Sequence, residues 1–265
     1  MGSQNLTIAA ENSPGTVPAL DRTLDILETL STTPHGLTLS ELSSRLDIPK
    51  NAVFRITQTL MARGYLSREA ETMSFQLTGQ WLKLATPRLG GMSLAALARP
   101  AMVALRDATG ETVQLGVLSG DSGTIIEQIE GTQSLRIVVD LGRRFALYNN
   151  APGKLLLAHL PDDQREQMIS QMALSPCTAK TITSKSELQK ECERILSQGY
   201  SIDHAESNEG IHCIAAPVVR EFEGVVAALW LSGPAKRLPK SRFRELGSMV
   251  KSAGKQVSRQ IAQMG

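Results

Sequence analysis

The chain has 265 residues, a formal net charge of +2, 42% hydrophobic residues and 20% charged residues. This length and composition suit a soluble protein with two globular domains and buried cores. The three cysteines, Cys177, Cys192 and Cys213, form no CxxC pair, which argues against a zinc cluster or disulfide framework and favours a reducing cytoplasm. The longest apolar run, residues 225–231, is too short to cross a bilayer, so we expect no membrane contact.

Residues 1–16 are small and polar and contain proline and glycine, so we expect a disordered tail there. They lack the basic region and apolar core of a secretory signal. Residues 17–47 contain five acidic and two basic residues, whereas residues 48–68 contain four basic residues and no acidic one. A local positive patch in a nearly neutral chain suits a polyanion bound at one place, although a solvated basic face explains the same charge.

Three helices are predicted next. Leucines recur at every third or fourth position over residues 20–30, which predicts an amphipathic helix over 18–30. A second helix should follow Thr38 or Ser40, because either side chain can cap it and Glu41 falls in its first turn. A third helix should begin after the turn at Pro49, run over residues 50–63 and bury its stripe of apolar side chains.

Two short segments after this helix, residues 65–68 and 73–77, alternate around a polar turn and predict a hairpin. The order helix, helix, turn, helix, hairpin is that of a winged helix-turn-helix, in which the third helix enters the DNA major groove and the hairpin lies along the backbone. The alternative is a small three-helix domain used for protein contacts. The candidate DNA-binding residues are Thr38, Ser40, Lys50, Asn51, Ala52, Arg55, Gln58, Arg63 and Arg68.

Residues 79–92 are expected to form a linker helix, packed against the copy in another protomer, with a domain boundary at Gly90 and Gly91. The predicted domains are therefore residues 17–78 and 93–265. In the second domain, helices are expected over 93–108, 152–159, 162–172, 185–197 and 239–263. Strands are expected over 112–118, 124–130, 135–139, 144–148, 200–203, 212–219 and 225–231. Grouped strands with helices outside them indicate an α+β fold on an antiparallel sheet.

Three stretches of the second domain are candidates for a small-ligand pocket: residues 148–154, 199–204 and 210–217. With Trp230 and Ser232 they would form a mostly apolar site with a few placed polar groups, as is usual for small-molecule pockets. The alternative is that these stretches contain only turns and strand ends.

The same residues could also suggest an enzyme. Cys213 follows His212, which resembles a nucleophile beside a base, but adjacent residues of a strand point to opposite faces of a sheet. No GxSxG, P-loop or GxGxxG motif is present. A metal site from Asp203, His204, His212 and Cys213 lacks the tight spacing of ligand sets. We therefore expect no enzyme activity, no metal and no cofactor; a cysteine-dependent enzyme using Cys213 remains the alternative.

From Pro18 onward the chain resembles the IclR family of bacterial transcription regulators. The resemblance rests on motifs that occur in order: ALDRTLDIL at residues 19–27, LSEL at 39–42, PKNAVFR at 49–55, GETVQL at 110–115, GKLLLA at 153–158 and GIHCIAAP at 210–217.

This resemblance implies a GAF-like second domain that binds a small organic acid or related metabolite, and a dimer or dimer of dimers on a near-palindromic operator of a catabolic operon. It also implies that Trp230 stands where members with very small keto-acid ligands have a small polar residue, so Trp230 either fills the pocket or stacks on a larger ligand. The residues it implies for effector binding are Asn150, Ala151, Gly153, Asp203, Cys213, Trp230 and Ser232.

Overall fold

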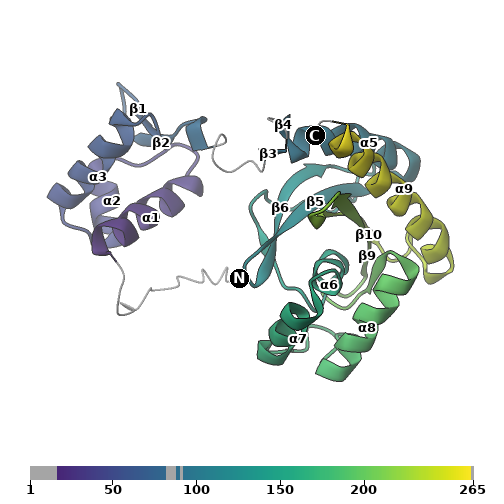
Figure 1. The fold of residues 1–265 in the computed structure, drawn as a ribbon. Coiled ribbons are helices and arrows are strands. Elements are labelled where there is room, and N and C mark those ends of the chain that lie inside the picture. Colours follow the sequence, from purple (N-terminus) through teal and green to yellow (C-terminus); the bar gives the residue numbers. More distant parts are fainter. Residues whose placement is uncertain (1–16, 82–87, 90–91, 264–265) are drawn as a thin grey trace. The chain divides into compact units, whose positions relative to one another are not determined.

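The computed structural model describes residues 17–81, 88–89 and 92–263. The chain divides into two compact units, Met1–Ala85 and Thr86–Gly265, and each is described by itself (Figure 1). The tail predicted for residues 1–16 lies outside the described residues. Among the helices of the described part, none is long and apolar enough to cross a membrane.

The first unit has the predicted order of elements. Its helices bury Ile26, Leu42, Val53 and Leu60, which pack together with Phe75 of the hairpin. These apolar side chains recur at helical spacing, so one face of each helix is removed from water. The elements are α1 (Pro18–Ser31), α2 (Leu39–Leu46), α3 (Lys50–Ala62) and the antiparallel strands β1 (Leu66–Arg68) and β2 (Phe75–Leu77).

The start of α2 is fixed by a capping box. The Thr38 hydroxyl accepts a hydrogen bond from the Glu41 N–H, and the Glu41 carboxylate accepts one from the Thr38 N–H at 2.7 Å. Thr38, not Ser40, is therefore the N-cap residue. At the other end of α2, Asp47 adopts a left-handed conformation with φ of 53°, which turns the chain into Pro49 and α3.

The predicted linker helix is described only in part. Gln80 and Trp81 are helical, and the Trp81 indole donates to the Tyr65 carbonyl at 2.9 Å, which fixes Trp81 on its own unit. Residues 82–87 and 90–91 of the prediction lie outside the described residues. The helix does not extend to residue 92, because β3 (Arg88–Leu89) pairs with β4 (Met92–Ser93) and Ser93 then caps α5.

The second unit contains a six-stranded antiparallel sheet with strand order β7-β6-β5-β10-β9-β8. The α+β prediction is thereby confirmed. The strands are β5 (Thr112–Ser119), β6 (Ser122–Ile129), β7 (Arg144–Phe145), β8 (Ser201–His204), β9 (Ile211–Arg220) and β10 (Gly224–Pro234). The helices are α5 (Leu94–Thr109), α6 (Ala151–Ala158), α7 (Asp162–Gln171), α8 (Lys185–Gln198), a 3-10 turn (Lys240–Arg242) and α9 (Phe243–Ala262).

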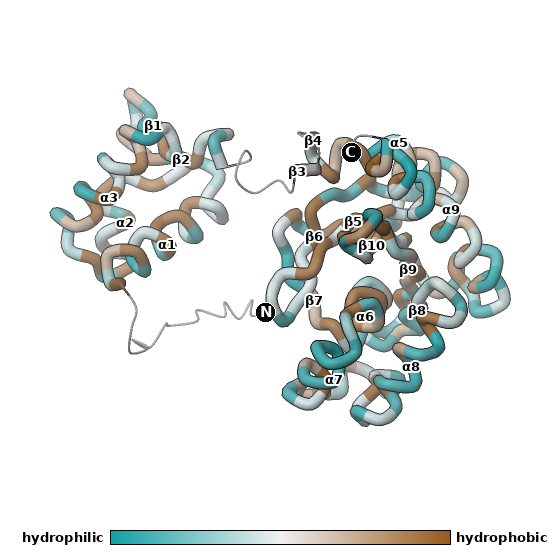
Figure 2. The backbone as a smooth tube through the Cα atoms, in the orientation of Figure 1, coloured by the Kyte–Doolittle hydropathy of each residue, from teal (hydrophilic) through white to brown (hydrophobic). Residues whose placement is uncertain are grey.

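The two faces of this sheet bury different side chains. Helices α5 and α9 cover one face, whereas α6, α7 and α8 lie on the other (Figure 1). Along β10, Leu229 and Leu231 belong to the core under α5 and α9, while Trp230 belongs to the core beside α6. Figure 2 shows α6 as hydrophobic and α7 and α8 as mostly hydrophilic. In keeping with this difference, every residue of α6 is buried. Side-chain alternation thus assigns each strand position to one core.

The strand predicted over residues 135–139 is wrong. Residues 130–143, which we call the strap, run from β6 toward β7 as irregular chain. Backbone hydrogen bonds with Ile125 hold the end of the strap at Gly142 and Arg143, but side chains hold its middle. The Thr112 hydroxyl donates to the Ile137 carbonyl at 2.7 Å, Arg237 donates to the Leu135 carbonyl at 2.8 Å, and the Gln128 amide oxygen accepts from the Val139 N–H at 3.1 Å. Alternating apolar residues therefore predicted a strand that does not form.

Candidate functional site

Helix α3 exposes a polar face on the side opposite its core contacts. Lys50, Asn51, Arg55 and Gln58 are exposed, as predicted from their spacing. Phe54 lies on the same face with an exposed fraction of 50%, and our sequence analysis did not single it out. The sequence did contain a signal for Phe54, because this aromatic residue lies outside the apolar stripe that its helix buries and is therefore left in water.

The remaining candidates of this unit lie around α3. Arg63 is exposed at its C-terminal end, and Ser40 is exposed on α2. The Arg68 guanidinium lies 5.2 Å from the centre of the Phe75 ring, and its Nε donates to the Met73 carbonyl at 3.3 Å. Two candidates are less available, since the Thr38 hydroxyl is engaged in the capping box and Ala52 is half-buried.

The cations of this surface lack acidic partners within the described part of the chain. Among the described residues, no ion pair involves Lys50, Arg55, Arg63 or Arg68. Their charge is therefore not neutralised by neighbouring carboxylates, and they can approach a phosphate without first breaking an ion pair.

The second unit contains a cavity of about 550 Å³ between the strap and the sheet. Five of the residues predicted for effector binding line it: Asn150, Asp203, Cys213, Trp230 and Ser232. The volume lies within the range of small-molecule pockets. Other lining residues are Gln114, Ile125, Arg136, Ile137, Val138, Val139, Arg143, Arg144, Phe145, Ala146, Asn149, Pro152, Ser207, Asn208 and Ile211.

Strand register aligns three of these polar residues in one row across the sheet. Asp203 of β8 is opposite Cys213 of β9, and Cys213 is opposite Ser232 of β10. The Ser232 hydroxyl donates to the Gln114 side-chain oxygen at 3.0 Å, and the Gln114 amide donates to Gln128 at 2.8 Å. This polar row lies on the face that α6 shares, so sheet pairing itself brings distant residues to the cavity.

His212 and Cys213 do not form a catalytic pair. The His212 ring is hydrogen-bonded through Nδ1 to the Leu238 carbonyl at 2.8 Å and packs against Phe243, on the opposite face of the sheet from the cavity. The Cys213 sulfur lies 3.3 Å from the Ser232 hydroxyl. Burial raises the pKa of the Cys213 thiol far above its usual range, so the thiol stays protonated and is a poor nucleophile.

Ala151 and Gly153 do not line the cavity. A Cβ at Gly153 would lie 2.2 Å from the Ala146 carbonyl, so glycine is needed there for close packing of α6. Asn150 does line the cavity, but its side chain is the N-cap of α6: Oδ1 accepts from the Gly153 N–H at 2.8 Å, and Nδ2 donates to Ala146 and Asn149. These residues therefore form the start of α6 and do not present free polar atoms to the cavity.

One wall of the cavity is aromatic. The Phe145 and Trp230 rings meet edge to face with centroids 5.6 Å apart. Glycines make space for both rings, because a Cβ at Gly123 would lie 2.1 Å from Phe145 and one at Gly116 would lie 3.0 Å from Trp230. Trp230 is 3% exposed, so it is part of the packed wall. Phe145 was missed, since it was predicted only as a strand residue.

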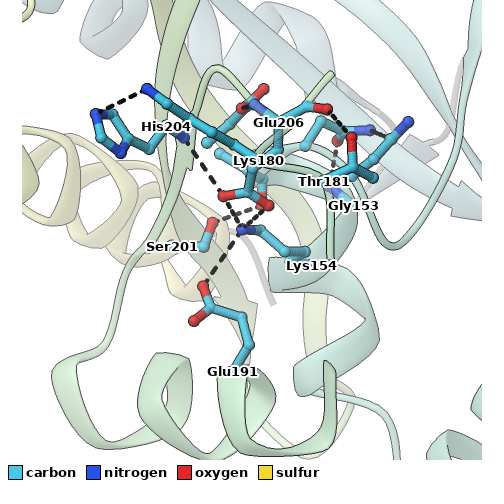
Figure 3. Close-up of polar contacts among 12 residues, drawn as sticks. Gly153, Lys154, Lys180, Thr181, Glu191, Ser201, His204 and Glu206 are labelled. Atoms are coloured by element: carbon cyan, nitrogen blue, oxygen red, sulfur yellow. Dashed lines mark hydrogen bonds and ion pairs between the residues drawn. The ribbon is translucent and has the colours of Figure 1, made fainter. Parts of the chain in front are cut away.

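A buried ion pair lies next to Asp203 of the polar row, and Figure 3 shows its members Lys154, Glu191 and Glu206. The Lys154 side chain on α6 is 1% exposed, and its Nζ lies 2.6 Å from Glu206 Oε1 and 3.3 Å from Glu191 Oε1. Arg194 shares the Glu191 carboxylate at 2.7 Å. The Glu206 N–H donates to Asp203 Oδ1 at 2.6 Å. Two cations thus match two carboxylates, and Asp203 is left without a cation of its own.

The pKa of Asp203 reflects this arrangement. Burial raises it to about 7 against the lowering effect of the hydrogen bond from the Glu206 N–H, and the charge of the Glu206 carboxylate adds to the rise. The Asp203 side chain therefore changes from protonated to ionised near neutral pH, at the edge of the cavity.

We predict that Lys154→Met lowers the free energy of unfolding by about 3–5 kcal/mol, because it leaves the Glu206 carboxylate buried without a cation. Adding Glu206→Gln should recover part of the loss. The matched control is Lys190→Met, which changes an exposed lysine of α8 and should alter stability by less than about 0.5 kcal/mol. Urea denaturation measures all three; equal losses for Lys154→Met and Lys190→Met would contradict the network.

A second prediction concerns pH. The folded Asp203 carboxyl holds its proton to about pH 7, whereas its ordinary pKa is 3.8. Its contribution to stability is therefore complete below the ordinary value and falls as pH rises toward 7, by at most about 1.4 kcal/mol per pH unit. Asp203→Asn removes this dependence, so its melting temperature relative to the wild type should rise between pH 5 and pH 8. A difference that stays constant over this range would refute the shift.

The comparisons with known proteins agree with this architecture. A model described as the IclR helix-turn-helix domain matches residues 19–70, and one described as the bacterial transcriptional regulator IclR C-terminal matches residues 87–259. The regulator BhcR of Paracoccus denitrificans is 33% identical over 95% of this chain and 89% of its own length. The regulator KdgR of Escherichia coli is 33% identical over 96% of this chain and 95% of its own.

A solved structure shows the same fold. The IclR homolog of Microbacterium hydrocarbonoxydans, in complex with 4-hydroxybenzoate, superimposes with a TM-score of 0.79 at 21% identity, over 92% of this chain and 99% of that one. The curated relatives are transcription regulators, not enzymes. The matched families cover both units, and the chain therefore belongs to the IclR family of DNA-binding bacterial transcription regulators.

Proposed function

We propose that this regulator binds a near-palindromic operator as a homodimer or dimer of dimers, and that a small organic acid or related metabolite in the cavity changes its operator affinity. The operator would control a catabolic operon. The observation that carries the proposal is that one chain combines two features. The exposed cations of α3 have no ion-pair partner among the described residues, and the second unit has a cavity lined by the polar row.

On the DNA side, two copies of α3 would occupy successive major grooves about 34 Å apart. Lys50 and Arg55 would contact phosphates or guanine, while Asn51 and Gln58 would read base edges. Phe54 would contact a thymine methyl group, which is the apolar feature of the major groove. The other candidates, Thr38, Ser40, Ala52, Arg63 and Arg68, would lie at the backbone on either side, with Arg68 on the wing.

Association of protomers is supported by the outer surface of α1. Leu20 is 56% exposed and Leu24 is 48% exposed, one helical turn apart on the same face. Neighbouring large apolar side chains in water favour a covering partner. A second copy of this chain is the partner that a near-palindromic operator requires.

On the effector side, a metabolite would alter DNA affinity only through its different affinities for two arrangements of the protein. The proposed contacts are Asp203, Cys213, Trp230 and Ser232, with Asn150 in the wall and Ala151 and Gly153 behind it at the start of α6. A carboxylic acid fits this proposal because arginines also line the cavity, and the structural neighbour from Microbacterium holds 4-hydroxybenzoate.

We predict that Lys50→Glu or Arg55→Ala lowers operator affinity by about tenfold or more without unfolding the chain, because both side chains are exposed. The duplex is first selected from a randomised library with the wild-type protein, which also reveals whether the site is near-palindromic. Gel shifts then measure affinity, and Arg55→Ala should reduce the slope of log affinity against log salt by about one.

The control for this experiment is Lys190→Glu, a charge reversal on exposed α8 that should leave DNA affinity unchanged. Unchanged affinity in both α3 variants would remove α3 from the interface. If the wild-type protein selects no duplex at moderate salt, the chain does not act by binding DNA directly.

We also predict that Ser232→Ala weakens binding of the metabolite by about fivefold or more, because it removes the hydroxyl group of the polar row. The metabolite is identified by a thermal-shift screen, and calorimetry then compares the variant with the wild type. The concentration of metabolite needed to change DNA affinity should increase by the same factor. Full metabolite affinity in Ser232→Ala would place the ligand elsewhere.

A further inference from the structure

The hairpin between β9 and β10 presents an aromatic side chain at its tip. Phe222 is 99% exposed, and its backbone is left-handed with φ of 66°. Both features are unfavourable, because a large apolar side chain is left in water and a bulky residue rarely adopts this conformation. The turn itself is closed, since the Glu223 N–H donates to the Arg220 carbonyl at 3.2 Å and the two side chains form an ion pair. Such an outlier on an ordered turn points to a functional contact.

A groove of about 420 Å³ lies between α9 and β9, close to this tip in sequence. Its lining residues include Pro217 and Val219 of β9 and Lys251, Lys255 and Arg259 of α9. Val219, three residues before Phe222, is 42% exposed. The Val219 N–H donates to the Ser258 hydroxyl of α9 at 2.8 Å, which ties the two walls together. The groove is therefore pre-formed, and its volume is within the range of pockets that hold small molecules, so an aromatic side chain fits in it.

The α9 wall of the groove is basic. Lys251, Lys255 and Arg259 recur every four residues, so they lie along one side of the helix. None of the three pairs with an acidic residue in the part of the chain that the structure describes, and none of the described lining residues is acidic. Lys251 donates to the Gln198 carbonyl at 2.8 Å, whereas Lys255 and Arg259 are exposed. The groove therefore suits an apolar group that carries negative charge beside it.

The hairpin tip has this complementary character. Phe222 stands between two glutamates, Glu221 and Glu223, and both are exposed. Glu223 is paired with Arg220, whereas Glu221 has no ion-pair partner among the described residues. Phe222 cannot occupy the groove of its own chain, because it is almost fully exposed. An aromatic side chain flanked by carboxylates matches an apolar groove flanked by cations, so the tip fits the groove of another copy of this chain.

We propose that two copies associate through their second units, with Phe222 of each copy in the α9 groove of the other and Glu221 facing Lys255 and Arg259. Tip and groove adjoin at Val219, so one two-fold axis beside this residue makes the contact twice, as a self-complementary interface requires. Phe222 would be the buried anchor, and the charges around it would form the rim. This inference rests on the proposed association of protomers and adds to α1 a second contact that needs no DNA.

The test is analytical ultracentrifugation of the full chain, without DNA, over a dilution series. We expect the wild-type protein to form assemblies larger than a monomer. Phe222→Ser should raise the dissociation constant of the largest assembly by at least about tenfold, because each interface loses two aromatic anchors. The substitution should leave the melting temperature of the separated chains unchanged or higher, since Phe222 makes no core contact.

Met73→Ser is the matched control. Met73 lies at the tip of the other hairpin, is 46% exposed and is also left-handed, with φ of 57°. Its replacement should change the dissociation constant by less than about twofold. Equal effects of Met73→Ser and Phe222→Ser, or a wild-type chain that stays monomeric at every concentration, would overturn the inference.

Exchange of charge tests whether the contact joins two copies. Glu221→Lys and Lys255→Glu should each weaken association by about fivefold or more, because each places like charges together at both contacts. A mixture of the two variants should associate within about threefold of the wild type, since every reversed tip then meets a reversed groove. A mixture no stronger than either variant alone would refute the pairing of Glu221 with Lys255.

These outcomes are separate from those of the proposed function. If Phe222→Ser assembles as the wild type does, the groove does not join copies, and the contact through α1 and binding of the selected duplex remain as proposed. If the wild-type protein selects no duplex, the proposed function fails whatever the dilution series shows.

Discussion

The alternation of side chains in an antiparallel sheet is the constraint on which the second unit depends. Every strand position belongs to one of two faces, and the two faces have different roles. The face under α5 and α9 is closed by apolar residues such as Leu115, Leu229 and Leu231. The other face packs on α6 but also carries Gln114, Cys213 and Ser232, which leaves a polar row beside the cavity. The same alternation places His212 away from Cys213 and removes the one plausible catalytic pair.

Buried charge holds this polar row in place. Lys154 joins α6 to α8 and to the turn after β8 through Glu191 and Glu206, and the Glu206 backbone in turn positions Asp203 (Figure 3). A buried ion pair contributes little net stability compared with apolar residues of the same shape. Its consequence here is geometric, because it fixes a carboxyl group that has no cation of its own at the edge of a cavity.

The two units treat their cations differently. In the second unit, most arginines at the surface are paired, as Arg136 is with Glu130 and Arg242 with Glu245. In the first unit, the described cations of α3 are exposed and have no acidic partner. Exposed cations without an acidic partner on one helix are what a surface for phosphates requires.

Sequence alone determined the local structure of this protein and the identity of its family. Helical spacing of leucines, a cap at Thr38 or Ser40 and the basic residues after Pro49 defined the helix-turn-helix, because helix periodicity and capping depend on residues only a few positions apart. The motifs of the second domain also pointed to five of the residues that line the cavity.

Only the tertiary structure decided how these residues meet. Residues 135–139 alternate like a strand, yet they form the strap, because Thr112, Gln128 and Arg237 bind its backbone from distant parts of the chain. The alignment of Asp203, Cys213 and Ser232 in one row across the sheet was equally invisible. Strand register and loop anchoring are set by contacts between residues far apart in sequence, and the periodicity of the sequence does not reveal such contacts.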